Sequence, residues 1–424
     1  MLHIGVGNLT ARYSQDIFNV AFGSYSWVYN NAGQKQVSVV LLGDDALSEM
    51  GEEWPATYKF HARILDFIRA RKPKAVMIDF LFLGHCLDST AKELVRILKK
   101  YKRDQIPVYL AVSQPNDLES ISRAFQIKQN VDIADYVIPV SVVKKTDATD
   151  FVDRQYPLKG MFAKESEQEI NSAAYQIYQD FELQSQDIYT QNIELFWGVG
   201  QDPINSKWMG SDCQDTWYNN FQRVLYAGLE KLDYKCIYTR SLSALDLLTF
   251  GVSNDDIQAV LNDKFVFYGG NILGSGDIAT TSLHTMLPGI YYHAMALDNL
   301  LTLGEHYKRR SLAPEQYYLY NTFLILMFFS LATFSYYIRL QYDECIYNQL
   351  RTRLNQNHQW LYYYSLHFLV SFLIIISFSI VSFYFFNLAV ANWLGHTSLI
   401  ATGLSDKVVT HAVSITKTIQ EWAD

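Results

Sequence analysis

The segment Lys264–Leu301 constrains the fold of this chain more than any other, because it prescribes three elements in a fixed order. Its first residues form a short apolar run that is typical of a buried strand, and a glycine-rich turn follows. A Pro-Gly step and a long apolar stretch starting near His293 then predict a helix. Glycine tolerates positive φ and proline fixes φ, so both occur where a strand turns back toward a helix. The segment therefore predicts a strand–loop–helix unit.

Apolar runs that alternate with amphipathic stretches continue this pattern along the chain. Strands are predicted at 36–42, 75–82, 107–112, 134–139 and 191–198, and helices at 60–68, 90–101, 168–181, 219–232 and 243–248. Strands that alternate with helices favour a mostly parallel sheet with helices on both faces. We therefore predict an α/β fold for the first three quarters of the chain.

Two long runs without charged residues follow the α/β region. Gln316–Ile338 has 23 residues with tyrosines near both ends, and Leu354–Ser405 has its apolar centre at Trp360–Phe386. About 20 apolar residues span the hydrocarbon core of a bilayer as a helix, and tyrosine suits the headgroup region. We predict an α-helical transmembrane hairpin with spans at about 316–338 and 360–386. Buried helices of a soluble core are the alternative.

These features divide the chain into three parts. Residues 1–312 are predicted to form the α/β domain, 313–390 the transmembrane hairpin, and 391–424 an interfacial or amphipathic C-terminal tail. Within the last two parts, Leu388–Leu404 is a weak candidate for a third span, because asparagine, histidine, serine and glycine residues interrupt its apolar character.

The charge distribution argues against a nucleic-acid partner. The chain has 35 Lys and Arg residues against 43 Asp and Glu residues, which gives a net charge of −8. All of this charge belongs to residues 1–315, since the remainder has equal numbers of both signs. Nucleic acids are bound through basic side chains that contact phosphates, and the sequence has no basic stripe.

Two blocks of residues identify a family. The later block contains Gly269, Gly274, Gly276, Asp277, Thr280, Thr281, Pro288, Gly289, His293, Ala294 and Asp298. The earlier block contains Asp44, Asp45, Trp54, Pro55, the run Phe60–Arg63, and Asp79. In order and content the blocks resemble the type-two CHASE family, sensory domains of bacterial signalling proteins, over about residues 14–304. The chain departs from the family pattern at Ala56–Lys59.

The resemblance implies a sensor that recognises a small ligand or a protein, and the two uncharged runs add that it is bound to the bilayer; we expect it to be non-enzymatic. No Ser-His-Asp or Cys-His arrangement marks a nucleophile. In the family such a sensor usually precedes a kinase or cyclase domain, and none fits into residues 393–424. We therefore expect relay through the membrane helices, as a homo-oligomer, to a separate output protein. The alternative is an effector that forms a pore, which would be lined by Ser371, Ser377, Ser379 and Ser382. A third alternative is a scaffold that recruits a partner without any ligand.

The candidate ligand site combines polar residues from both blocks. Its predicted members are Asp45, Asp79, Gly274, Gly276, Asp277 and His293. If the strands that carry the two blocks are neighbours, their carboxyl ends bring these residues to the crevice where open α/β sheets bind ligands. Carboxylate and imidazole groups suit a polar small molecule or a metal, although no particular metal and no cofactor is predicted. The structural alternative is that the carboxylates cap helices or hold loops and that the histidine is packed.

The glycines near this site do not match a nucleotide-binding pattern. Gly269, Gly270, Gly274 and Gly276 follow a strand, but they lack the Gly-Lys-Ser/Thr ending of a P-loop and the spacing of a dinucleotide fingerprint. A structural turn at the sheet edge is therefore favoured over a phosphate site.

Opposing signals bear on which side of a bacterial inner membrane the α/β domain lies. Lys308–Arg310 before the first span favour the cytoplasmic side, whereas Arg339, Arg351 and Arg353 in the connecting loop favour the opposite arrangement. Residues 1–30 lack a basic segment followed by an unbroken apolar one, so no signal peptide is expected. A multi-pass protein with a cytosolic α/β domain is therefore predicted.

The cysteines, at positions 86, 213, 236 and 345, are widely spaced and indicate neither a disulfide framework nor a zinc site.

Overall fold

The computed structural model describes most of the chain. The described residues are 5–23, 25–82, 88–114, 116–130, 132–160, 170–182, 191–205, 236–249, 253–283, 286–310, 316–351 and 359–389. They fall into two compact units, Asn19–Lys308 and a second unit made of Met1–Phe18 with Arg309–Asp424. Helix α1 (Gly5–Phe22) has residues in both units.

A six-stranded parallel sheet forms the centre of the first unit, as predicted. Its strands, in spatial order, are β4 (Ile138–Ser141), β3 (Val108–Val112), β2 (Ala75–Asp79), β8 (Phe265–Asn271), β1 (Val37–Gly43) and β7 (Arg240–Ser243). Strand β8 lies between β1 and β2, with Asp79 opposite Gly269 in the register. The two blocks identified in the sequence are therefore carried by neighbouring strands.

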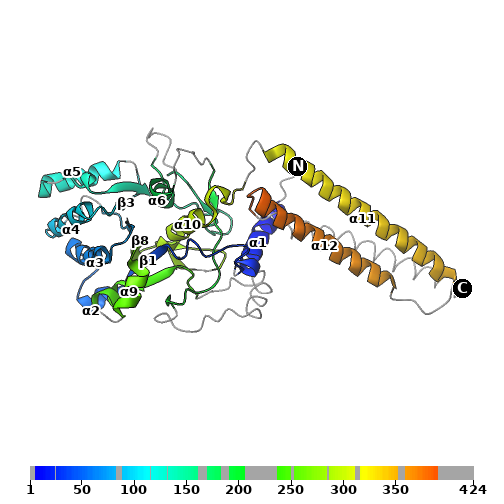
Figure 1. The fold of residues 1–424 in the computed structure, drawn as a ribbon, viewed down its shortest axis with the longest axis horizontal. Coiled ribbons are helices and arrows are strands. Elements are labelled where there is room, and N and C mark those ends of the chain that lie inside the picture. The colour runs from blue at the N-terminus through cyan, green and yellow to red at the C-terminus, as the bar shows by residue number, and fades with distance from the viewer. Residues whose placement is uncertain are drawn as a thin grey trace. The chain divides into compact units, whose positions relative to one another are not determined.

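One face of the sheet is covered by a group of amphipathic helices (Figure 1). They are α2 (Asp44–Met50), α3 (Tyr58–Ala70), α4 (Ala91–Arg103), α5 (Asp117–Gln129), α8 (Ala244–Thr249) and α9 (Asn254–Leu261). In α4 the buried residues Leu94, Ile97, Leu98 and Tyr101 recur at helical spacing, so a single apolar stripe faces the core. The side chains of alternate residues in β2 and β8 complete this cluster.

Helices α6 (Ala173–Phe181) and α10 (Ile290–Leu303) cover the opposite face of the sheet (Figure 1). Helix α10 is buried on all sides from Ile290 to Leu300, so it is the central helix of the unit. Its first turn contacts β8 at Gly269, where a Cβ atom would lie 2.8 Å from the Cβ of Ile290. Glycine at this position therefore sets the distance between strand and helix.

Short strand pairs complete the first unit. They are β5 (Gln155–Tyr156) with β6 (Ile193–Glu194), and β9 (Ile278–Ala279) with β10 (Leu287–Pro288). The strand expected at 191–198 is thus only two residues long. Beyond it the Asn299 side chain accepts a hydrogen bond from the Phe196 N–H and donates one to the Phe196 carbonyl, both at 2.9 Å. A side chain of α10 replaces the neighbouring strand that this apolar segment predicted.

Two long helices characterise the second unit. Helix α11 (Tyr317–Arg351) lies beside α12 (Gln359–Phe385), and the Phe323 ring stacks on Phe378 at a centroid distance of 4.9 Å. In the described part of the chain one segment, Ser365–Phe385, is long and apolar enough to cross a membrane, and Tyr317–Leu331 is a shorter apolar stretch. Helix α11 continues beyond the predicted end at residue 338. The predicted tail at 391–424, the helix at 219–232 and most of 388–404 lie outside the described residues.

Candidate functional site

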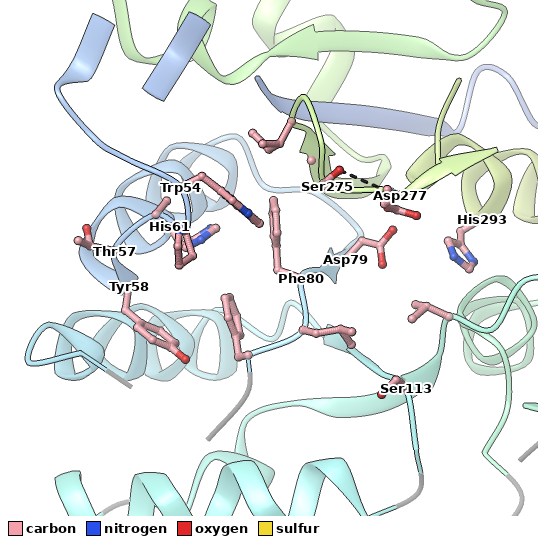
Figure 2. A pocket seen from close by; sticks show the side chains of 18 of the residues that line it. Trp54, Thr57, Tyr58, His61, Asp79, Phe80, Ser113, Ser275, Asp277 and His293 are labelled. Carbon is pink, nitrogen blue, oxygen red and sulfur yellow. Dashed lines mark hydrogen bonds between the residues drawn. The ribbon is translucent and has the colours of Figure 1, made fainter. Parts of the chain in front are cut away.

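A cavity of about 770 Å³ opens at the carboxyl ends of β2, β3, β4 and β8 (Figure 2). The segments that directly follow these four strands line it, together with the loop that leads into α3 and the first turn of α10. All of these segments belong to the first unit. This is the edge at which open parallel sheets bind ligands, and the volume lies within the usual range for small-molecule sites.

One side of the cavity is an aromatic wall, formed by Trp54, Tyr58, His61, Phe80 and Phe82. The Phe80 ring lies 6.0 Å from that of Trp54 and 4.7 Å from the His61 ring, measured between centroids. Trp54 is 45% exposed, while the other four side chains are buried. The wall offers an apolar surface with one residue, Trp54, in contact with solvent at its edge.

Strand periodicity explains why the wall and the acidic groups face different ways. Val76, Ile78 and Phe80 point toward α3 and its neighbours, as the successive members of one face. Asp79 lies between them in sequence and therefore points to the other side of the sheet, toward α10. The end of β2 thus supplies an aromatic group and a carboxyl group to one cavity.

The other side of the cavity is a polar cluster, formed by Asp79, Lys144, Asp277 and His293. The Asp79 and Asp277 carboxyl groups point into a common space in front of the His293 ring (Figure 2). Lys144 Nζ donates to Asp277 Oδ1 at 2.9 Å and to the Ile278 carbonyl at 3.0 Å. The ammonium group of Lys144 is therefore already engaged on one carboxylate.

The Asp277 carboxylate approaches the N-terminus of α10 because residue 289 is glycine. A Cβ atom on Gly289 would lie 2.1 Å from Asp277 Oδ1, so any other residue would displace the carboxylate. The positive end of the helix dipole stabilises a negative charge there. This contact gives the Pro-Gly step of the sequence a role in shaping the cavity.

Asp79 is an acid without a partner. Burial raises its pKa to about 8, the negative charge of Asp277 adds to this rise, and Lys144 opposes it. Asp79 therefore carries a proton at neutral pH. No hydrogen bond to its carboxyl group comes from any residue that the structure describes, so both oxygens remain available to a molecule in the cavity.

His293 presents a neutral N–H group to the cavity. Its Nδ1 lies 2.9 Å from the Tyr156 hydroxyl oxygen, which also accepts a hydrogen bond from the Ala174 N–H at 3.1 Å. The hydroxyl proton is then directed at Nδ1, which leaves the proton of the neutral ring on Nε2. Burial lowers the pKa of His293 to about 4 despite the nearby Asp277, so the ring is uncharged at neutral pH.

The structure brings four of the six predicted site residues together: Asp79, Gly276, Asp277 and His293 line the cavity. Gly274, with φ +82°, belongs to the turn before it. Asp45 is exposed at the start of α2, away from the cavity lining. Its neighbour Asp44 accepts a hydrogen bond from the Leu273 N–H at 2.8 Å and so holds the loop after β8. The acidic pair after β1 contributes to the shape of this edge through Asp44.

Sequence reasoning missed Lys144, Ser113 and the aromatic wall as members of the site. The signal for Lys144 and Ser113 was their position directly after strands, at the same edge as Asp79. No group of three or more His, Cys, Asp or Glu side chains in the described part of the chain is placed to hold a metal ion.

Comparison with known proteins identifies a family. The family model of the CHASE2 domain matches residues 4–334, which is most of the chain. Searches of curated proteins and of solved structures return no match.

Proposed function

The chain belongs to the CHASE2 domain family, a family of sensory domains, and we propose that it is a membrane-anchored sensor that binds a small ligand in the cavity at the carboxyl ends of β2 and β8. The observation that carries the proposal is the unpartnered Asp79 carboxyl group inside a 770 Å³ cavity that also has an aromatic wall. Asp79 is half-buried and its carboxyl group faces the cavity, so a molecule in the cavity can supply the hydrogen bonds that no described residue makes to it.

Binding rather than catalysis is the proposed role of the cavity. Two hydroxyls of its lining are bound to carboxylates: that of Ser113 donates to Asp117 Oδ2 at 2.8 Å, and that of Thr57 donates to Glu52 at 3.2 Å. The two histidines of the lining, His61 and His293, are hydrogen-bonded to the hydroxyls of the buried tyrosines Tyr268 and Tyr156, whereas nucleophilic catalysis of the usual kind needs a serine, threonine or cysteine beside the base. The arrangement suits recognition of a ligand by charge and shape.

Helix α10 connects the cavity, along the chain, with the segments proposed to span the membrane. It begins at Ile290, contributes His293 to the cavity, and ends at Leu303, after which the chain leads to α11. We propose that ligand contact at the start of α10 biases the arrangement of α11 and α12 and so reaches a separate output protein. Exposed apolar side chains on α11, such as Ile325 and Phe329, suit contact with lipid or with other copies of the chain in a homo-oligomer.

The pore alternative has weaker support. Ser371, Ser379 and Ser382 are buried within the second unit, and the Ser379 hydroxyl donates to the Ile375 carbonyl of its own helix at 3.0 Å. Serines that line a pore would face open space in a single copy of the chain, and of the four predicted serines only Ser377 is exposed. We therefore favour the sensor.

The side of the membrane is a separate part of the proposal. Cys236 is disulfide-bonded, and disulfides persist mainly in oxidising compartments. This observation favours an extracytoplasmic location for Asn19–Lys308, against the cytosolic location that the sequence predicts. Added protease is then expected to digest this unit in intact spheroplasts, and protection of the unit until the cells are lysed would support the cytosolic alternative.

A substitution that fills the cavity tests ligand binding. Val143 lines the cavity, and Val143→Trp introduces an indole ring into it. The full-chain protein in detergent is dialysed to equilibrium against a small-molecule extract of its host cells, and bound compounds are identified by mass spectrometry. We expect at least one compound to accumulate with the wild type and not with Val143→Trp. Gln126→Trp, at an exposed position of α5, is the matched control and should bind like the wild type. Identical compounds with wild type and Val143→Trp would contradict the proposal.

A further inference from the structure

We propose that the ligand of this cavity is an amphipathic amine, whose ammonium group lies between the Asp79 and Asp277 carboxyl groups and whose apolar part packs on the aromatic wall. This inference rests on the proposed function, because it names the chemical class that the same site recognises. It is carried by the charges, the hydrogen bonds and the shape of the cavity.

The polar cluster lacks one positive charge. The groups that face Asp79 are Asp277 from the loop after β8, Lys144 from the segment after β4, His293 from α10 and Tyr156 from β5. His293 and Tyr156 are buried and neutral, and Lys144 is bound to Asp277. Two carboxyl groups therefore share one cation, and a second cation would allow both to ionise.

The charge of the ligand follows from this deficit. An anion would be repelled by Asp277 and would find the nearest ammonium group, that of Lys144, already paired. A neutral ligand would leave Asp79 without a charged partner. An ammonium group supplies the missing charge and forms charge-assisted hydrogen bonds, which are about twice as strong as neutral ones.

The aromatic wall accounts for the apolar part of the ligand. Phe80 directly follows Asp79, so the wall begins next to the acidic cluster in the same cavity. Phe80 and Phe82 are stacked with their ring centroids 6.5 Å apart, and Trp54 closes the outer end beside Phe80. Flat rings of this kind pack against an aromatic or alkyl group and also attract a nearby cation through their π faces.

Binding of an amine should release a proton from the protein. Asp79 is protonated in the empty cavity at pH 7, and an ammonium group beside it lowers its pKa. As long as Asp79 is protonated in the free protein, the affinity for an amine therefore rises with pH, by up to about tenfold per pH unit. Above about pH 8, where Asp79 is already ionised in the free protein, the affinity levels off. The amine itself keeps its charge over this range.

Three indole compounds that differ in one group test the inference by titration calorimetry on the full chain in detergent. They are tryptamine, its hydroxyl analogue tryptophol and its carboxylate analogue 3-(indol-3-yl)propanoate. We expect tryptamine to bind about tenfold or more tightly than tryptophol, and the carboxylate not to bind. At pH 7 the apparent enthalpy of tryptamine binding should differ between phosphate and Tris buffers, because nearly one proton is released per bound amine.

Two variants assign the effect to the acidic cluster. Asp79→Asn keeps the shape of the protonated acid, so the fold should persist; the affinity for tryptamine should fall about tenfold or more and the proton release should disappear. Asp255→Asn, an exposed substitution in the first turn of α9, is the matched control and should leave both unchanged.

The possible failures are distinguishable. Any of three results would overturn the amine assignment. Tryptophol could bind as tightly as tryptamine, proton release could persist in Asp79→Asn, or tryptamine could fail to bind at millimolar concentration. A compound that the wild type binds and Val143→Trp excludes would then leave the proposed function standing. If Val143→Trp excludes no compound, the proposed function itself is wrong.

Discussion

Replacement of Gly33 by alanine should lower the free energy of unfolding by about 3 kcal/mol. A Cβ atom at this position would lie 2.5 Å from the carbonyl oxygen of Asp298 and 2.8 Å from its Cα. These are backbone atoms of α10, the buried central helix, and they cannot move aside as the end of a side chain can. The Gly33 N–H also donates to Thr302 Oγ1 at 3.0 Å, a bond that the displaced loop would lose.

Urea unfolding of the full chain, followed by circular dichroism, measures this effect. Gly51→Ala is the matched control, since a Cβ atom there meets no atom within 4 Å and only the left-handed φ of +67° is unfavourable. Its cost should be about 1 kcal/mol. A Gly33→Ala protein as stable as the wild type would show that the loop before β1 does not pack closely on α10.

The second large effect concerns the pH dependence of stability and arises from Asp298. This residue is fully buried in α10 and accepts a hydrogen bond from the Tyr29 hydroxyl. Burial raises its pKa to about 7, although hydrogen bonds from Tyr29 and Thr302 oppose the rise. The pKa of aspartate in an unfolded chain is about 3.9. The stabilising contribution of protonated Asp298 is therefore complete below about pH 4 and is lost as the pH rises toward 7.

Asp298→Asn removes this titration and keeps an oxygen that can accept from Tyr29. Relative to the wild type, the variant should be more stable at pH 8 than at pH 5 by about 1–3 kcal/mol. Urea unfolding of both proteins at the two pH values gives this difference. The other perturbed groups, Asp79, His61 and His293, titrate in both proteins and so cancel. An equal difference between the proteins at both pH values would contradict the buried, protonated state of Asp298.

The sheet could be predicted because its signals are local. Apolar runs such as Val37–Leu42 and Ala75–Ile78 are buried on both faces, as strands of a parallel sheet are, and the glycines after β8 mark its end. The spatial order of the strands is not local. The sequence does not predict that β8 lies between β1 and β2; that the two blocks are neighbours was only a condition for a shared site, and the pairing of β8 with both β1 and β2 fulfils it.

The candidate site could be predicted in part, because the ends of its strands are recognisable locally in the sequence. Asp79, Asp277 and His293 follow or flank the ends of adjacent strands, so the rule for open sheets places them together. Asp45 follows β1, which β8 separates from β2, and α2 begins directly at Asp44, so the side chain of Asp45 lies at the helix start. The place of Lys144 in the site could not be predicted, because it depends on β3 and β4 extending the sheet beside β2, and no local pattern encodes this strand order.

The helices of the second unit show a further limit of local signals. Charged residues after Ile338 predicted the end of the first span, yet α11 continues to Arg351. Charge decides where a segment can enter a bilayer, whereas backbone hydrogen bonding continues through residues of good helix propensity such as Arg339 and Leu340. The length of a helix and the length of its apolar part are separate quantities here.

The most direct test of the account of this cavity as an amine site is the electron density in the cavity of the full chain determined with saturating tryptamine. The account predicts density for one tryptamine molecule, with its ammonium group within hydrogen-bonding distance of Asp79 and Asp277 and its indole ring against Phe80. Val143→Trp, treated in the same way, should show an empty site. A cavity without density in the wild type at saturating tryptamine, or an amine bound elsewhere on the protein, would contradict the account.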